Sequence, residues 1–359
     1  MAATPVNKHI AVEPPETWQD RFRDAVAPRS LAMGLGVLLL QLGFILSYLG
    51  AFHSPTPHRI PVEVVAPAQA AGQIVDKLNG LTGEPLAATA TDDEDTAREA
   101  LRTGSTSAVY LFDPAGTADR LLVASGGGTA VSGAVQQVFT KVTAAQQRTV
   151  AVDDVVPLLP GDGRGMSGFY LVIGWVVGGY LFASLLGIAK GSRPATFPRV
   201  FWRLGITVPY ALLSGLGGAV VAEPVLHAMN GHFWSIAGIG TLVTLSATTV
   251  TIALQTLFGV IGIGLTVIIF VILGNPSAGG AYQPSVLPPF WRAISSYLPN
   301  GAGTEAIRRV VYFGGHGVNH PVVVLICWIV GGVLVTLIGA AVFHRPGRET
   351  AAGPSTAHQ

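Results

Sequence analysis

The stretch that decides the fold is WSIAGIGTLVTLSATTVTIALQTLFGVIGIGLTVIIFVIL, from Trp234 to Leu273, which contains no charged side chain. As one helix rising about 1.5 Å per residue, it would be roughly 60 Å long, twice the ~30 Å hydrocarbon core of a bilayer. We therefore expect two membrane-spanning helices here, at 234–255 and 257–273. A tight turn near Gln255 to Gly259 would join them.

Other apolar segments are also long enough to cross a bilayer, which needs about 20 apolar residues in a helix. They lie at 31–52, 168–189, 204–222 and 322–343. The expected fold class is an α-helical polytopic membrane protein with about six transmembrane helices. The first segment could instead be a cleaved signal peptide, but the apolar region of a signal peptide is only about 7–15 residues long. An uncleaved signal anchor is therefore the better interpretation.

The composition agrees with a chain that lies largely in lipid. Hydrophobic residues make up 50% of it and charged residues only 11%, whereas soluble domains carry about 25% charged residues. The formal net charge of +1 gives no indication of a nucleic-acid partner. The single cysteine, Cys327, excludes an intrachain disulfide. Many of the 45 glycines lie in apolar segments, where small residues let helices approach closely.

Lysines and arginines beside the predicted spans indicate the orientation of the chain, because cytoplasmic flanks carry an excess of them. They gather in three places: Lys8, Arg21, Arg23 and Arg29; Lys190, Arg193, Arg199 and Arg203; Arg345 and Arg348. With six spans, all three groups fall on one side. We therefore predict a protein of the cell membrane with a cytoplasmic N-terminal segment (1–30), a disordered cytoplasmic tail (344–359) and an extracytoplasmic domain at 53–167.

That domain is predicted to have an α/β fold, because short strand-like and helix-like patterns alternate along it. Strands are expected at 60–65, 85–89, 107–112, 120–125 and 149–156, with helices at 67–81, from Thr91, and at 130–146. Thr91 and Glu94 have the spacing of a capping box for the middle helix.

Two polar runs in the domain have alternative interpretations. The acidic run 92–95 could bind a metal ion, but carboxylates in a first helical turn also complement the helix dipole, which we favour. The run Gly126 to Thr129 could cradle an anion in front of a helix. We favour a flexible turn with Thr129 as the helix cap.

Enzyme motifs are missing from the sequence. It has no nucleotide-binding P-loop, no H-E-x-x-H and no cysteine–histidine cluster with zinc spacing. We therefore expect no enzymatic activity, no cofactor and no metal. The predicted spans also contain no Asp, Glu, Lys, Arg or His, which disfavours ion-coupled transport. Hydroxyl residues at 241–251 could line a polar path, but such groups more often bond to the carbonyls of their own helix.

The segment 275–321 is predicted to lie at the outer leaflet of the membrane. It contains two short amphipathic stretches bounded by proline or glycine, which we interpret as helices in or dipping into that leaflet, a plain loop being the alternative. Their candidate functional residues are Pro288, Pro289, Trp291, Glu305 and Arg308.

Asp162 and Arg164 lie where the predicted domain meets the second span. They could couple the domain to the bundle, by pairing with each other or with the outer segment. A surface ion pair without a coupling role is the alternative.

Several short motifs resemble a known family when taken in order. They are IPVEVV at 60–65, AREAL at 97–101, GDGRG at 161–165, NPS at 275–277, LPP at 287–289 and YLPN at 297–300. In these, from about Leu31 to Phe343, the chain resembles the phage-infection-protein-like branch of the type-2 ABC transporter permeases. The resemblance implies a homodimeric membrane subunit that works with a separate ATPase.

In that family the loop after the second span would contact the ATPase, so Lys190, Arg193, Arg199 and Arg203 are candidate contact residues. Anchoring of the topology by positive charge is the alternative for this loop. The function expected is the permease subunit of an exporter for an apolar or amphipathic compound. The alternative is a non-transport scaffold, receptor or secretion-apparatus protein of the cell envelope.

Overall fold

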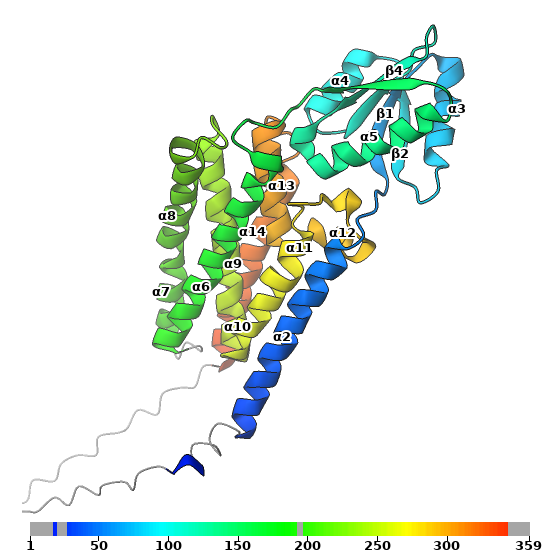
Figure 1. Cartoon of the computed structure of the whole chain (residues 1–359). Helices are drawn as coiled ribbons and strands as arrows, with labels where there is room; N and C mark the ends of the chain where they lie inside the picture. Colours follow the sequence, from blue (N-terminus) through cyan, green and yellow to red (C-terminus); the bar gives the residue numbers. More distant parts are fainter. Residues whose placement is uncertain (1–16, 20–26, 192–196, 344–359) are drawn as a thin grey trace, which may run out of the picture. The chain divides into compact units, whose positions relative to one another are not determined.

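The computed structural model describes residues 17–19, 27–191 and 197–343 (Figure 1). The predictions for Arg193 and for the tail 344–359 concern residues outside these ranges. Of the N-terminal segment before Ala27, only Thr17–Gln19 is described. Within them, helices are long and apolar enough to cross a membrane at Ser30–Phe52, Ser167–Ala189, Pro198–Val225, Phe233–Phe258 and Asn319–Val342. These five helices are compatible with a multi-pass membrane protein.

A sixth span at 257–273 is not confirmed. Helix α9 (Phe233–Phe258) continues to Phe258 and ends at Gly259, whose φ of 64° places it in the left-handed region that glycine tolerates. The predicted turn is therefore confirmed. The chain then enters a shorter helical run made of α10 (Ile261–Val267), the π-helical η4 (Ile268–Gly274) and α11 (Asn275–Ser277). This run is apolar but shorter than the other candidate spans.

Helix α9 forms the centre of the helical bundle. It packs against α6 (Ser167–Lys190), α8 (Thr207–Val220) and α14 (Asn319–Phe343) (Figure 1). Glycines permit the close approach: a Cβ at Gly240 would lie 2.5 Å from the Trp175 ring and 3.0 Å from the Cα of Gly215. The hydroxyls of α9 mostly donate to carbonyls of their own helix, such as Thr251 to Ala247 at 2.7 Å. These hydroxyls therefore bond to the carbonyls of their own helix, as the sequence analysis favoured over a polar path.

The other bundle elements differ from expectation at their ends. The third apolar helix is longer than predicted, because α7 (Phe197–Gly205) precedes α8 and the candidate span begins at Pro198 rather than Leu204. It ends in a π-helical turn, η3 (Val221–Val225). Helix α2 (Pro28–Phe52) corresponds to the predicted first span.

The segment 275–321 does form two short helices, α12 (Pro289–Ser295) and α13 (Pro299–Tyr312), rather than a plain loop. However, α13 is not a surface helix with one buried face. It packs against α6, α9 and α14, and its buried residues lie around much of its circumference.

A five-stranded mixed sheet forms the domain between α2 and α6, which we call the sheet domain. Its strands are β1 (Ile60–Val65), β2 (Leu86–Thr91), β3 (Ala108–Leu111), β4 (Ala118–Val123) and β5 (Thr149–Asp154), in the order β2-β1-β3-β4-β5. Only the β3–β4 pair is antiparallel. The predicted α/β fold and all five strand positions are confirmed within a few residues.

Helices cover both faces of this sheet (Figure 1). Because side chains alternate along a strand, Ala108 and Tyr110 of β3 pack with α3 (Ala68–Asn79) and α5 (Thr129–Ala144). Val109 and Leu111 face the other way and pack with α4 (Glu94–Arg102). Phe313, from the end of α13, joins this second face.

Two predicted helix caps are wrong. Thr91 still pairs with β1, and Asp93 caps α4 by accepting from the backbone N–H groups of Asp95 and Thr96. The acidic run is thus a helix start, as favoured. Gly128, with a φ of 140°, precedes α5, and Thr129 is already in the helix.

Candidate functional site

The sheet domain meets the bundle at the C-terminal end of α13. Arg309 Nη1 donates to the carbonyl of Gly104 at 3.0 Å and approaches that of Thr103 at 3.4 Å. Gly104 has a φ of 70°, and a Cβ there would lie 2.9 Å from Arg309 Nη1 and 3.0 Å from the Phe313 ring. The turn after α4 therefore requires glycine both for its backbone and for the approach of α13.

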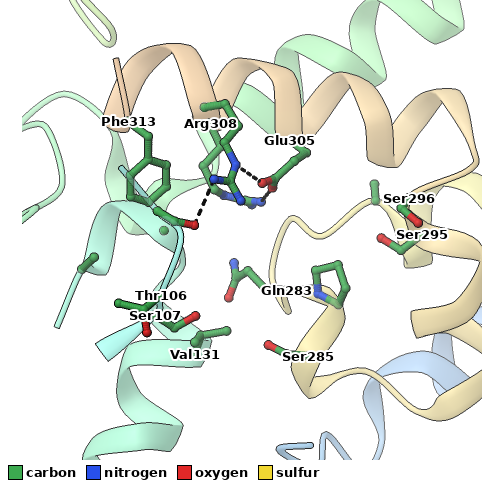
Figure 2. A pocket seen from close by; sticks show the side chains of 16 residues that line it. Thr106, Ser107, Val131, Gln283, Ser285, Ser295, Ser296, Glu305, Arg308 and Phe313 are labelled. Atoms are coloured by element: carbon green, nitrogen blue, oxygen red, sulfur yellow. Dashed lines mark hydrogen bonds and ion pairs between the residues drawn. The ribbon is translucent and has the colours of Figure 1, made fainter. Parts of the chain in front are cut away.

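Glu305 holds two arginines on this part of α13 (Figure 2). Its carboxylate accepts from Arg308 at 2.7 Å and from Arg309 at 2.6 Å. Arg308 also donates to the Gly279 carbonyl at 2.6 Å. Burial raises the pKa of Glu305, but the charges and hydrogen bonds of the two arginines outweigh it and hold that pKa below its usual value. Glu305 thus pairs with both arginines within α13, and these arginines also reach two other parts of the chain.

Asp162 is the second connection between sheet domain and bundle. It is 2% exposed and accepts from the Tyr312 hydroxyl at 2.6 Å and from the backbone N–H of Ser167 at 2.8 Å. Burial and the carboxylate raise the pKa of Tyr312, so the hydroxyl keeps its proton. The predicted link from Asp162 to the 275–321 segment is present.

Arg164 does not share in this connection. It is exposed, has a φ of 60°, and makes no ion pair with Asp162 in the described part of the chain. The prediction that the two pair with each other is therefore wrong, because the Asp162 carboxylate turns inward toward Tyr312.

The glycine run before α5 is a packing surface. A Cβ at Gly126 would overlap the Tyr312 ring, one at Gly127 would lie 3.1 Å from Phe313, and one at Gly128 would overlap the side chain of Gln283. Sequence reasoning missed this role, because the partners lie more than 150 residues further along the chain.

A cavity of about 330 Å³ lies at this junction (Figure 2). The sheet domain contributes Thr106, Ser107 and Val131, and α13 contributes Glu305, Arg308, Arg309 and Phe313. Gln283, Ser285, Ser295 and Ser296 come from the stretch between α11 and α13. This combination of polar, charged and apolar groups makes the junction the candidate functional site.

The proline and tryptophan candidates lie beside the cavity, not in it. Pro288 precedes α12 and Pro289 is its first residue. Trp291 is 8% exposed and packs with Leu287 and with Ala51 in the last turn of α2. These residues therefore belong to the start of α12 and its packing, and not to the lining of the cavity.

Two motifs that carry the family resemblance meet in the structure. Asn300, which is fully buried, donates to the side chain of Asn275 at 2.7 Å and to the Phe270 carbonyl in η4 at 3.0 Å. A Cβ at Gly274 would overlap Asn300. The asparagines thus join the start of α13 to the end of the 261–277 helical run.

The predicted ATPase-contact residues differ from one another in position and exposure. Lys190 ends α6, and Arg193 lies outside the described residues. Arg199 is exposed on α7. Arg203 is only 9% exposed and donates to the side chain of Gln255 at 3.1 Å, so it is a bundle residue rather than a surface contact.

No protein-family model, curated protein or solved structure matches the chain. The fold and the site therefore define only a broad class: a protein with several candidate membrane spans that carries a mixed α/β domain. Among the described residues, no group of three or more His, Cys, Asp or Glu side chains could hold a metal ion.

Proposed function

We propose that this protein is the permease subunit of an ABC-type exporter for an apolar or amphipathic compound, powered by a separate ATPase. The observation that carries the proposal is the connection through α13. This helix is buried among bundle helices and bonds to the sheet domain through Arg309 and Tyr312. A change in the bundle that moved α13 would therefore move the domain as well.

The arrangement of the bundle supports the same proposal. Its central helix is uncharged and packs through glycines, so movement between helices would not break buried ion pairs. The resemblance of the short motifs to type-2 ABC permeases adds a second line of support. The exposed Arg199 on α7 would then face the ATPase, with Lys190 nearby in the chain.

Crosslinking in native membranes followed by mass spectrometry tests this proposal. We expect crosslinks from Lys190 and its neighbourhood to an ATPase subunit, and a rise in ATPase turnover when the two proteins are reconstituted together. Crosslinks only to a second copy or to envelope-assembly proteins would contradict the exporter function.

The cavity at the junction favours a second candidate, a receptor or scaffold of the cell envelope. A site between domain and bundle could report ligand binding to the bundle without any transport. Deleting residues 58–160 tests the receptor. If the protein is a receptor or scaffold, the deletion should abolish its function although the bundle still assembles. A truncated protein that still functions would exclude the receptor.

A further inference from the structure

The junction cavity has more positive than negative charge on its wall. Its ionisable lining residues are Arg308, Arg309 and Glu305, so two guanidinium groups face one carboxylate. Arg308 is 8% exposed, and Glu305 and Gly279 use only part of its five N–H donors. A buried charge that is incompletely compensated favours an anionic ligand.

Gln283 supplies an acceptor in the same cavity. It is 5% exposed, and its Nε2 donates to the Gly280 carbonyl at 3.2 Å. Its Oε1 is buried and has no hydrogen-bond partner in the described part of the chain. Figure 2 shows this side chain between the sheet-domain residues and α13. A buried amide oxygen without a partner costs stability unless a donor reaches it, which favours a ligand with a hydroxyl group.

The size of the cavity limits the ligand. The cavity volume of about 330 Å³ lies at the small end of the roughly 300–1,000 Å³ that is typical of ligand pockets. Ser285, Ser295 and Ser296 add hydroxyls that can donate or accept. The cavity therefore suits a small, strongly polar molecule or the headgroup of a larger one.

We propose that this cavity binds a phosphorylated polyol, with the phosphate on Arg308 and Arg309 and a polyol hydroxyl donating to Gln283. Guanidinium groups match phosphate oxygens in geometry and charge. The site does not depend on the exporter function, because binding is a property of the junction alone. The same chemistry occurs in a soluble sugar or glycerol phosphate and in the headgroup of an anionic phospholipid.

Calorimetric titration of the full-length protein with sn-glycerol 3-phosphate tests the site. We expect saturable binding with one site per chain in nanodiscs of phosphatidylcholine, weakening as salt is raised. In nanodiscs that contain phosphatidylglycerol, a lipid headgroup as the natural ligand would compete and weaken the binding of glycerol phosphate. A soluble ligand would bind equally in both.

Variants of Gln283 make the test specific. Gln283→Met keeps the size of the side chain but removes the acceptor, so we expect affinity to fall at least tenfold. Gln283→Glu places a negative charge beside the phosphate and should abolish binding. Gln137→Met, at an exposed position on α5, is the matched control and should bind as the unmodified protein does.

Two results would overturn the proposal. Absence of saturable binding in both kinds of nanodisc would exclude the site, as would binding that both Gln283 variants leave unchanged. Thermal unfolding of each variant without ligand shows whether it is folded. Should Gln283→Met be unfolded, Ser296→Ala replaces it, with an expected loss of about threefold for a neutral hydrogen bond.

Discussion

Asp119 is a single residue on which the sheet domain depends. Its carboxylate is fully buried and accepts from the Tyr110 hydroxyl at 2.6 Å, from Arg148 at 2.6 and 2.8 Å, and from the backbone N–H of Asp113 at 2.9 Å. Burial raises the pKa of Asp119, but these hydrogen bonds and the charge of Arg148 outweigh it, so the pKa lies below its usual value.

The lowered pKa of Asp119 predicts a stability that depends on pH. The stabilisation is complete above the unfolded-state pKa of about 3.9 and is lost as the pH falls through the lower folded-state value. We expect the protection factors of the backbone amides in β3 and β4, which correct for the intrinsic pH dependence of hydrogen exchange, to fall below about pH 4. Asp119→Asn should lose this dependence and cost about 3 kcal/mol at pH 7, because Arg148 loses its partner. An Asp119→Asn variant that is as stable as the unmodified protein would contradict the stabilising role of this carboxylate.

Glu305 is the residue whose replacement should loosen the junction. Glu305→Gln leaves two arginines beside each other without their carboxylate, which should cost about 1–3 kcal/mol at this partly exposed position. We expect faster hydrogen exchange at 103–106 and 278–285, measured by mass spectrometry. Glu94→Gln is the control, since its pair with Arg98 lies at the surface of α4 and contributes under about 1 kcal/mol. Equal protection in both variants would show that the Glu305 pairs do not hold the junction.

At the scale of elements, the contact between α8 and α9 depends on particular glycines. A Cβ at Gly215 would overlap the Ala237 carbonyl oxygen and lie 2.7 Å from the backbone nitrogen of Thr241, whereas one at Gly217 would meet nothing within 4 Å. Gly215→Ala should therefore separate the helices and destabilise the bundle by about 1–3 kcal/mol. Gly217→Ala should be neutral or stabilising by under ~1 kcal/mol, because alanine favours a helix.

The heat stability of the protein in detergent checks this difference, measured as the fraction still monodisperse after heating. Both variants change the same helix by one methyl group, so only the packing differs. A similar loss of monodisperse protein in both variants, or no loss in either, would contradict the close α8–α9 contact.

The sequence predicted most elements because their signals are local. Alternation along a strand located β1 to β5, and long apolar runs located α2, α6, α9 and α14. The burial of α13 could not be predicted, because its charged residues Glu305, Arg308 and Arg309 are satisfied by one another and by distant carbonyls. The link of Asp162 to Tyr312 joins residues 150 apart in the sequence, which no local pattern reveals.

For the whole molecule, the orientation in the membrane is a prediction that can be tested. Positive charges beside the spans predict that α7 is cytoplasmic and the sheet domain extracytoplasmic. The proposed exporter would need that orientation, since its ATPase would have to reach the Lys190 to Arg203 region from the cytoplasm. It also places the junction cavity on the outer side, where a phospholipid headgroup or an external solute could enter it.

Cysteine labelling in intact cells measures this orientation directly. Because Cys327 is the single cysteine of the chain, Cys327→Ser gives a background without thiols into which one new cysteine can be placed. Gln137→Cys, exposed in the sheet domain, should react with a membrane-impermeant maleimide from outside. Arg199→Cys, exposed on α7, should react only after the cells are permeabilised. The reverse pattern would invert the topology, and labelling of both positions from outside would place α7 on the same side of the membrane as the sheet domain; either result would exclude the ATPase contact at α7.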